Sequence, residues 1–539
     1  MRSPRAQTLW RQRQRAYTTD IAIVAGTLFF HFWKLGQRPL AHDESIDAWF
    51  SLQAGHGAII RYDPVYHGPL RFFLQGGILR VFGSSAGQTR YLSALCGSLM
   101  VVAVLGSRKM LGKTGSRVGA VLLTVSPTVL TVTRTGREDS LVALLSLGML
   151  LAVGRLLTEP KPRHLVTFLA LLALSFATKE TTFIFCAAGG AFLVFAASWH
   201  ALTAVRNRRE HTTRDQTSRP IARILNIGSE VWLSAGTVFI LLFVAVFTSF
   251  FRWNQGIKAG IFDGIKYWIS QHKVGRGGQP WFFYLSIYTS YEWLLLGLGV
   301  SGLVLAIKKR AILGNWFAVM GLVQLAIYSW AGEKFAWLAI HPLIPMALLA
   351  ALFVQMASEE HKTSNRLLEV GFCLAAMGTL FLAIGPAIDR GADPRELLVT
   401  VQTSESVKQE ANWLVAASKI NGKLSVVVDE SDAGSWPWVW YLRNIRNVRY
   451  EKLDPRRLPE ADVVILRASA IEPIVPVGFE IRRFPLRVWW IPDYRTMTLG
   501  DAARWFLTRT TWNSTGSSDQ YLITRAGMFV RPKLTPRSH

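Results

Sequence analysis

The chain has 539 residues, half of them hydrophobic, and carries 60 Lys and Arg residues against 35 Asp and Glu, a formal net charge of +25. A module that binds nucleic acid would present that charge as a basic stripe or patch on a soluble fold. The basic residues instead gather in short connections between long apolar runs, which is typical of the positive-inside bias of membrane proteins. The charge therefore favours a membrane protein and argues against a nucleic-acid partner.

Apolar runs recur over the first 388 positions, and a run of about 20 residues is long enough to cross a hydrocarbon core of roughly 30 Å. The first run follows a basic N-terminus and has no small-residue cleavage site after it, so it predicts a retained helix and not a cleaved signal. We predict about eleven spanning helices. They cover residues 17–36, 91–107, 118–133, 141–157, 165–177, 182–199, 231–251, 287–307, 316–330, 337–356 and 367–388.

The orientation follows from the basic loops, because Lys and Arg favour the cytoplasmic side. We expect the protein to lie in the cell membrane (plasma or inner) with its N-terminus in the cytoplasm. With this orientation, the predicted spans make every cytoplasmic loop basic. These loops cover residues 108–117, 155–163, 206–223, 308–310 and 362–366. An odd number of spans then places the C-terminal part outside the cytoplasm.

The first outside loop, residues 37–90, has two stretches of helical periodicity. Ile46, Trp49 and Phe50 share a face in the first stretch, and residues 70–82 have an apolar face in the second. Both predict interfacial helices that lie along the membrane surface. A second outside loop, residues 252–286, holds the glycine-rich string 275–278 and predicts a mobile lid over a site.

The last 150 or so residues lack spanning runs and predict a separate water-soluble domain. Strands are expected at residues 397–401, 424–428 and 463–466, with helices at 407–417 and, rich in Trp, at 434–443. Such alternation predicts a small parallel α/β layer. The expected fold is an α-helical polytopic membrane domain, residues 1–388, followed by an α/β domain, residues 389–539. No glycine-rich nucleotide-binding motif is present in the sequence.

Acidic, basic and imidazole side chains cluster on the outside connections. Ionisable groups at that depth are costly unless they pair or face a cavity, and any single one is more often structural than catalytic. Several on one side predict a shared polar cavity, roofed by the first loop and the C-terminal domain. The candidates are Asp43, Glu44, His67, Arg90, Arg137, Glu138, Asp139, Lys179, Glu180, Glu333, Lys334 and His341.

This mixture suits the transfer of a group from a lipid phosphate. A carboxylate beside an acceptor hydroxyl can act as general base, and Arg and Lys can hold a phosphate and stabilise its charge as it leaves. The lipid tail would lie along apolar helices while its head enters the cavity. The residues alone do not say which group is moved.

Several strings resemble the GT-C glycosyltransferases, in the protein mannosyltransferase-like and aminoarabinose transferase-like branch, and most closely the flippase-activity-associated family. The resemblance runs over most of the chain, and its most specific part joins Tyr-Asp-Pro to His-Gly-Pro. The strings are His42-Asp-Glu-Ser-Ile46, Tyr62-Asp-Pro-Val-Tyr-His-Gly-Pro69, Ala177-Thr-Lys-Glu-Thr181, Gly332-Glu-Lys334 with Trp337 and His341-Pro342, and Trp436-Pro-Trp438 with Trp440-Tyr-Leu442.

The resemblance implies an inverting, single-displacement transfer from a polyprenyl-phosphate sugar. Asp43 matches the carboxylate that acts as base or binds the acceptor, with Glu44 beside it, and Asp139 or Glu138 matches the second acidic position. From charge and placement, Lys179, Arg90 and Lys334 are candidates for the donor phosphate. Because some of these enzymes use a divalent ion, such a cation is a possible cofactor, but a histidine in an interfacial loop is more often a hydrogen-bonding residue. His42 and His67 would join Asp43 as its ligands.

Two other functions stay open. In the first, the chain is a non-catalytic partner of a lipid-linked oligosaccharide flippase and binds the lipid-linked sugar without chemistry. In the second, which is disfavoured, it is a secondary transporter, but these often show internal repeats and charges near the midplane. The tryptophans of the C-terminal domain could stack on sugars, pack in a core or rest on the membrane surface.

Overall fold

The computed structural model describes residues 4–210, 218–271, 275, 277–360, 366–469 and 471–527. The chain forms two compact units. The helical unit comprises Met1–Leu35 and Ser51–Asp389, and the sheet unit comprises Gly36–Phe50 and Arg390–His539. Each unit has its own hydrophobic core. The predicted division at residue 388 stays a prediction, and Arg276 of the predicted lid lies outside the described residues.

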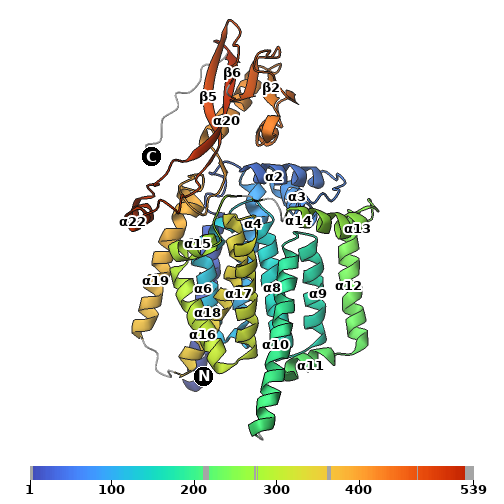
Figure 1. The fold of residues 1–539 in the computed structure, drawn as a ribbon, viewed down its shortest axis with the longest axis vertical. Helices are drawn as coiled ribbons and strands as arrows, with labels where there is room; N and C mark the ends of the chain where they lie inside the picture. Colours follow the sequence, from blue (N-terminus) through green and yellow to red (C-terminus); the bar gives the residue numbers. More distant parts are fainter. Residues whose placement is uncertain are drawn as a thin grey trace. The chain divides into compact units, whose positions relative to one another are not determined.

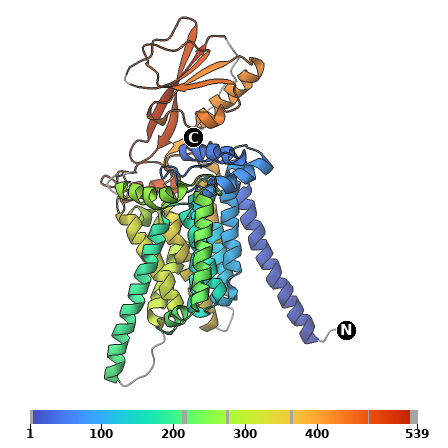
Figure 2. The ribbon, with the colours of Figure 1, turned by 90° about the vertical axis from the view of Figure 1, so that its right-hand side faces the viewer.

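The helical unit is built from long helices that run side by side, with α13 and α14 crosswise at one end and α11 at the other (Figures 1 and 2). Its helices are α1 (Pro4–Phe32), α3 (Leu70–Phe82), η1 (Gln88–Arg90), α4 (Tyr91–Leu105), α5 (Arg108–Leu111), α6 (Lys113–Val125), α7 (Pro127–Thr133), α8 (Asp139–Thr158), α9 (Pro162–Phe176), α10 (Thr182–Glu210), α11 (Ser218–Leu225), α12 (Ser229–Phe247), α13 (Gly256–Lys258), η2 (Ala259–Asp263), α14 (Gly264–Gln271), α15 (Phe283–Tyr291), α16 (Trp293–Lys309), α17 (Ile312–Trp330), η3 (Ala336–Ala339), α18 (Ile340–Glu360), α19 (Arg366–Ile384) and η4 (Gly385–Asp389). Helix α2 (His42–Gly55) begins in the sheet unit and ends in the helical unit.

The chain is a multi-pass membrane protein. Over the described residues, seven helices are long and apolar enough to cross a membrane, or up to nine if two bent pairs each count as one span. All eleven predicted runs fall largely on helices, but α9 has only 15 residues and α1 does not meet the same test. The number of eleven spans and the orientation of the termini therefore stay predictions.

A buried carboxylate joins the two bent spans. Helix α6 meets α7 at 62°, and α15 meets α16 at 110°. Glu292, at the second break, accepts hydrogen bonds from the Ser126 hydroxyl at 2.6 Å and from the Thr128 amide at 2.8 Å. The Thr128 amide is one of the first-turn donors of α7 that no helical carbonyl satisfies. Glu292 therefore caps α7, whose far end leads into the connection that precedes α8.

The sheet unit holds a six-stranded mixed sheet in the order β1-β5-β6-β4-β2-β3, in which only β2–β3 and β2–β4 pair in parallel. The predicted strands 424–428 and 463–466 match β2 and β4, which pair in parallel as predicted, but the antiparallel pairing of β1, β5 and β6 makes the sheet mixed. The strands are β1 (Gln402–Thr403), β2 (Ser425–Asp429), β3 (Asn447–Glu451), β4 (Val463–Arg467), β5 (Phe479–Trp489) and β6 (Gly516–Arg525), and the helical elements are α20 (Glu405–Ile420), η5 (Ser431–Ala433), α21 (Trp438–Tyr441) and α22 (Leu499–Thr508).

Two local predictions for this unit were wrong in their bounds. Residues 397–401 are not a strand: Leu397 and Leu398 lie in a turn and are buried together with Val399, whereas Val401 is exposed. The Trp-rich helix covers only α21, which has Pro437 as its N-cap. Trp438 and Trp440 are buried, and the Trp438 indole donates to Gln520 Oε1 at 2.8 Å. These two tryptophans therefore pack in the core.

Candidate active site

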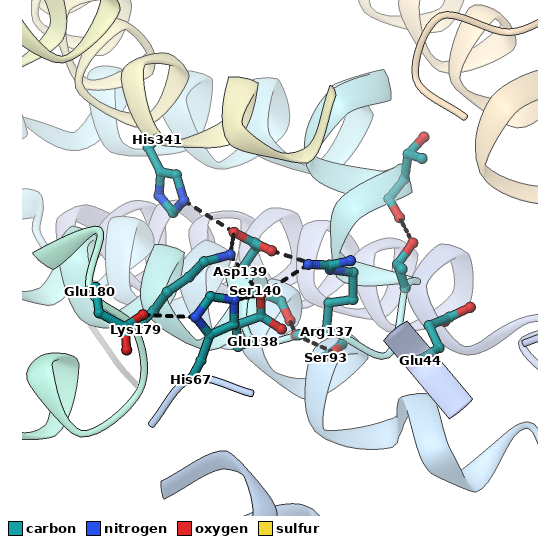
Figure 3. A network of polar contacts seen from close by, with 12 residues as sticks. Glu44, His67, Ser93, Arg137, Glu138, Asp139, Ser140, Lys179, Glu180 and His341 are labelled. Atoms are coloured by element: carbon teal, nitrogen blue, oxygen red, sulfur yellow. Dashed lines mark hydrogen bonds and ion pairs between the residues drawn. The ribbon is translucent and has the colours of Figure 1, made fainter. Parts of the chain in front are cut away.

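A buried ionic cluster lies at the start of α8 in the helical unit (Figure 3). The Lys179 ammonium, on the connection between α9 and α10, lies 2.6 Å from Glu138 Oε1 and 2.7 Å from Asp139 Oδ1. All three side chains are 6% exposed or less. Bonds this short between full charges are among the strongest in proteins. The members of the ionic cluster are His67, Arg137, Glu138, Asp139, Lys179, Glu180 and His341.

Arg137 adds a second cation to the same carboxylates. Its guanidinium lies 3.2 Å from Glu138 Oε1 and 3.5 Å from Asp139 Oδ2, and it stacks 4.1 Å from the centre of the Trp337 ring. A guanidinium on an aromatic face is held in orientation as well as attracted. Trp337 belongs to the string from Gly332 to His341, which is one of the strings that carry the predicted resemblance.

His67 connects Glu180 to the rest of the ionic cluster. Its Nδ1 lies 2.7 Å from Glu180 Oε2, and its Nε2 lies 3.5 Å from Glu138 Oε1. The other Glu180 oxygen accepts a hydrogen bond from the Tyr62 hydroxyl at 2.8 Å. The string that holds Tyr62 and His67 therefore contacts the string that holds Lys179 and Glu180.

A tight turn before α3 explains why these residues are His-Gly-Pro. His67 has a φ of 65°, a left-handed conformation that is uncommon outside glycine. Gly68 donates its amide to the Thr178 carbonyl at 3.0 Å, and a Cβ at this position would lie 2.2 Å from the Ala177 oxygen. Pro69 then stands as N-cap of α3. Only glycine permits the backbone contact that places His67 beside Glu180.

His341 reaches the ionic cluster from α18. Its Nε2 lies 3.6 Å from Asp139 Oδ1, and its ring stacks on Tyr328 with centroids 5.7 Å apart. The side chain is buried. It therefore closes the side of Asp139 that α18 faces.

The charges of the ionic cluster stabilise one another against the cost of burial. Burial favours the neutral form of Lys179, but Asp139 and Glu138 outweigh it and raise the pKa of the ammonium. Burial raises the pKa of Glu138, but Lys179, Arg137 and His67 outweigh it and hold that pKa well below its usual range. For His67, burial lowers the pKa, and the Glu180 and Glu138 carboxylates raise it further than burial lowers it. With His67 protonated, three carboxylates face three cations.

Asp43 and Glu44 lie in the sheet unit, in the first turn of α2. Glu44 is buried, and its carboxylate accepts from Arg38 Nη2 at 3.0 Å and from the Ala41 amide at 2.9 Å. This bond to the N-cap amide is half of a capping box. Asp43, next to it, is partly exposed. Glu44 therefore holds the start of α2.

Three candidate residues lie on other parts of the helical unit. Arg90 is fully buried and donates to the Leu35 carbonyl at 2.8 Å, at the end of the α1 segment. Lys334 donates to the Ala331 carbonyl, and burial lowers the pKa of its ammonium. Glu333 precedes it between α17 and η3. Arg90 and Lys334 thus each donate a hydrogen bond to a backbone carbonyl.

The histidines predicted as possible metal ligands have other partners in the structure. His42 Nδ1 accepts from Arg487 Nη2 at 2.9 Å, and His67 pairs with two carboxylates. A cation donor on His42 Nδ1 occupies a lone pair that a metal would need. In the described part of the chain, no group of three or more His, Cys, Asp or Glu side chains is arranged to hold a metal ion.

Sequence reasoning missed two residues that position the site. Tyr62 belongs to one of the strings that carry the resemblance, but its position does not predict that its hydroxyl orients Glu180. Glu292 was not singled out, although a lone acid inside the apolar run 287–307 signals a buried partner.

Comparisons with known proteins agree with this architecture. A family model described as dolichyl-phosphate-mannose-protein mannosyltransferase matches residues 66–206. The chain resembles ArnT from Cupriavidus metallidurans in the apo state, with 15% identity, a TM-score of 0.54, and coverage of 82% of this chain and 86% of ArnT. For the same protein bound to undecaprenyl phosphate, the identity is 12% and the TM-score is 0.55, with coverage of 94% of this chain and 98% of ArnT. For the apo oligosaccharyltransferase from Archaeoglobus fulgidus, the identity is 12% and the TM-score is 0.53, with coverage of 82% of this chain and 65% of the oligosaccharyltransferase.

The fold is therefore that of the GT-C superfamily, and the predicted resemblance is confirmed at that level. None of the matches named here is to the flippase-activity-associated family, so the closer resemblance stays a prediction. A search of curated proteins gave no match.

Proposed function

The chain has the GT-C fold of membrane glycosyltransferases, and on that premise we propose that it transfers a sugar from a polyprenyl-phosphate donor to an acceptor on the non-cytoplasmic face, with inversion. The observation that carries the proposal is the ionic cluster at the start of α8. So many buried charges at the ends of membrane helices are costly to assemble, and this points to a site and not to a solvated loop.

The donor class is supported by the ligands of two proteins of this fold. ArnT was solved bound to undecaprenyl phosphate, and the Archaeoglobus fulgidus oligosaccharyltransferase in complex with dolichol-phosphate. In this chain, Arg137 and Lys179 would bind the phosphate. Both cations are already held in place by Glu138 and Asp139, and an oriented cation stabilises a departing phosphate without reorganisation.

The proposed reaction is a single displacement. The Asp43 carboxylate takes the proton of the acceptor hydroxyl as its oxygen attacks the anomeric carbon. The bond from that carbon to the phosphate oxygen breaks, and its electron pair leaves with polyprenyl phosphate. Attack opposite the leaving phosphate inverts the anomeric configuration. Glu138 and Asp139 are almost fully buried and paired, so their role in this scheme is to position Lys179 and Arg137.

The test is transfer by the purified chain in proteoliposomes that contain a panel of undecaprenyl-phosphate hexoses and pentoses, with membranes of the source cells supplying the acceptor. We expect Asp43→Asn to lose transfer by at least about 100-fold, the low end of general-base catalysis. Asp454→Asn, an exposed carboxylate of the same unit that caps a turn, is the matched control and should transfer normally.

The same assay separates the alternative function. Binding of undecaprenyl phosphate by the wild-type chain without turnover of any donor would support a non-catalytic partner of a lipid-linked oligosaccharide flippase. Normal transfer by Asp43→Asn would remove Asp43 as the base.

A further inference from the structure

Residues 36–50 fold with the C-terminal part of the chain. They precede the rest of the sheet unit by more than 300 residues, yet they belong to the same compact unit. The Leu40 amide donates to the Tyr441 hydroxyl at 2.8 Å, and Gln402 Nε2 donates to the Pro39 carbonyl at 3.1 Å. Lys408 Nζ donates to the Gly36 carbonyl at 3.1 Å. The backbone of this segment is therefore satisfied by side chains from the far end of the sequence.

The anchoring side chains come from different elements of the sheet unit. Gln402 lies on β1, Lys408 on α20, Tyr441 on α21 and Arg487 on β5. They converge only when the sheet and its helices are assembled. The conformation of residues 36–42 thus depends on the whole sheet unit being folded.

This anchored segment leads directly into the turn that carries Asp43. Arg38 and the Ala41 amide both bond to the Glu44 carboxylate, which fixes the first turn of α2. Asp43 stands between the anchored residue His42 and the capping residue Glu44. Its backbone has little freedom to move independently of the sheet unit.

Arg487 anchors His42, the residue directly before Asp43. Its Nη2 donates to His42 Nδ1 at 2.9 Å and to the Ala433 carbonyl at 2.7 Å. The guanidinium interacts electrostatically with Asp43 and with Asp432. Through His42, it can therefore hold the position of Asp43.

We propose that the sheet unit is the positioning element of the Asp43 carboxylate, with Tyr441 and Arg487 as its positioning residues. This rests on the proposed function, in which Asp43 is the base. Misplacement of a reacting group by about 1 Å can lower a rate about 100-fold, so a base in the first turn of a helix needs its position held. The C-terminal part of the chain then takes part in catalysis by positioning the base.

The first test is Tyr441→Phe, with Tyr450→Phe as matched control on β3 of the same unit. Removal of the hydroxyl deprives the Leu40 amide of its acceptor. Hydrogen exchange of residues 36–50 should quicken about 2- to 10-fold, the change that one hydrogen bond produces. The kcat of transfer should fall about 10- to 100-fold while KM for the donor lipid stays the same. Tyr450→Phe should change neither.

The second test is Arg487→Gln against Arg487→Lys. Gln removes the cation and should lower kcat at unchanged KM, and Lys should restore most of it because a charge remains beside Asp43. Unchanged exchange in Tyr441→Phe, or unchanged kcat in both Tyr441→Phe and Arg487→Gln, would overturn the proposal. Normal transfer by Asp43→Asn defeats the base assignment instead, and the exchange result still decides whether the sheet unit holds the segment.

Discussion

Lys179 is the residue on which the ionic cluster depends most. It is the only ammonium within 3 Å of both Glu138 and Asp139 among the described residues. Removing one partner of a buried ion pair leaves an uncompensated buried charge, which costs more than the pair contributes. A change at this residue therefore disturbs two carboxylates at once.

We expect Lys179→Met to destabilise the helical unit by about 3–5 kcal/mol. The measurement is the thermal unfolding midpoint of the purified chain in detergent. Lys309→Met is the control, because Lys309 pairs with Glu360 at an exposed site and its loss should leave the midpoint unchanged. Adding Glu138→Gln to Lys179→Met should recover part of the loss, since a neutral amide needs no cation. Equal midpoints for the two single variants would contradict the account.

For single residues, the sequence predicted more accurately which side chains lie together than which role each side chain has. His67, Arg137, Glu138, Asp139, Lys179, Glu180 and His341 were all named as candidates, and the structure brings them together. The role of each side chain is less predictable because it depends on the partners that the side chain meets in the fold. Glu44 was named as catalytic beside Asp43, but its bonds to Arg38 and Ala41 give it a capping geometry that its sequence position does not specify.

At the scale of elements, the turn before α3 determines the geometry of the ionic cluster. Gly68 lies against the backbone of Ala177 and Thr178, at the end of the α9 segment, and two backbone hydrogen bonds hold the contact. A glycine at such a close approach cannot gain a Cβ unless one of the segments moves. The positions of His67 and Lys179 are thereby linked.

We expect Gly68→Ala to destabilise the chain by about 1–3 kcal/mol, the usual cost of forcing atoms into a packed contact. Gly77→Ala, on α3, is the control, because a Cβ there meets nothing within 4 Å. Alanine inside a helix should leave stability equal or raise it by about 0.5–1 kcal/mol. Unfolding midpoints of both variants check this, and a Gly68→Ala midpoint at or above that of the wild-type chain would contradict the close contact.

Helices were more predictable than strands in this chain, for a physical reason. A spanning helix satisfies its backbone within itself, so a long apolar run is sufficient to signal it. Strand β5 has Pro485 and three arginines along its eleven residues, so its pattern does not indicate a buried strand, and its pairing with β6 is antiparallel and non-local. The two-residue strand β1 is too short to leave a pattern at all.

At the scale of the whole molecule, the sequence predicted a membrane part and a C-terminal part but not the membership of residues 36–50. The bonds that tie this segment to the sheet unit join residues separated by 363 to 445 positions. No local pattern encodes contacts over that distance. The segment reads as the start of an outside loop, and only the fold shows that it is built into the sheet unit.

The assignment to test first is that Asp43 is the base and that Lys179 and Arg137 bind the donor phosphate. The most direct measurement is an experimental structure of the full chain with an undecaprenyl-phosphate hexose bound. We predict that the phosphate contacts Lys179 or Arg137, and that the Asp43 carboxylate faces the anomeric carbon from the side opposite the phosphate. A phosphate bound away from both cations, or Asp43 turned away from the sugar, would contradict the assignment.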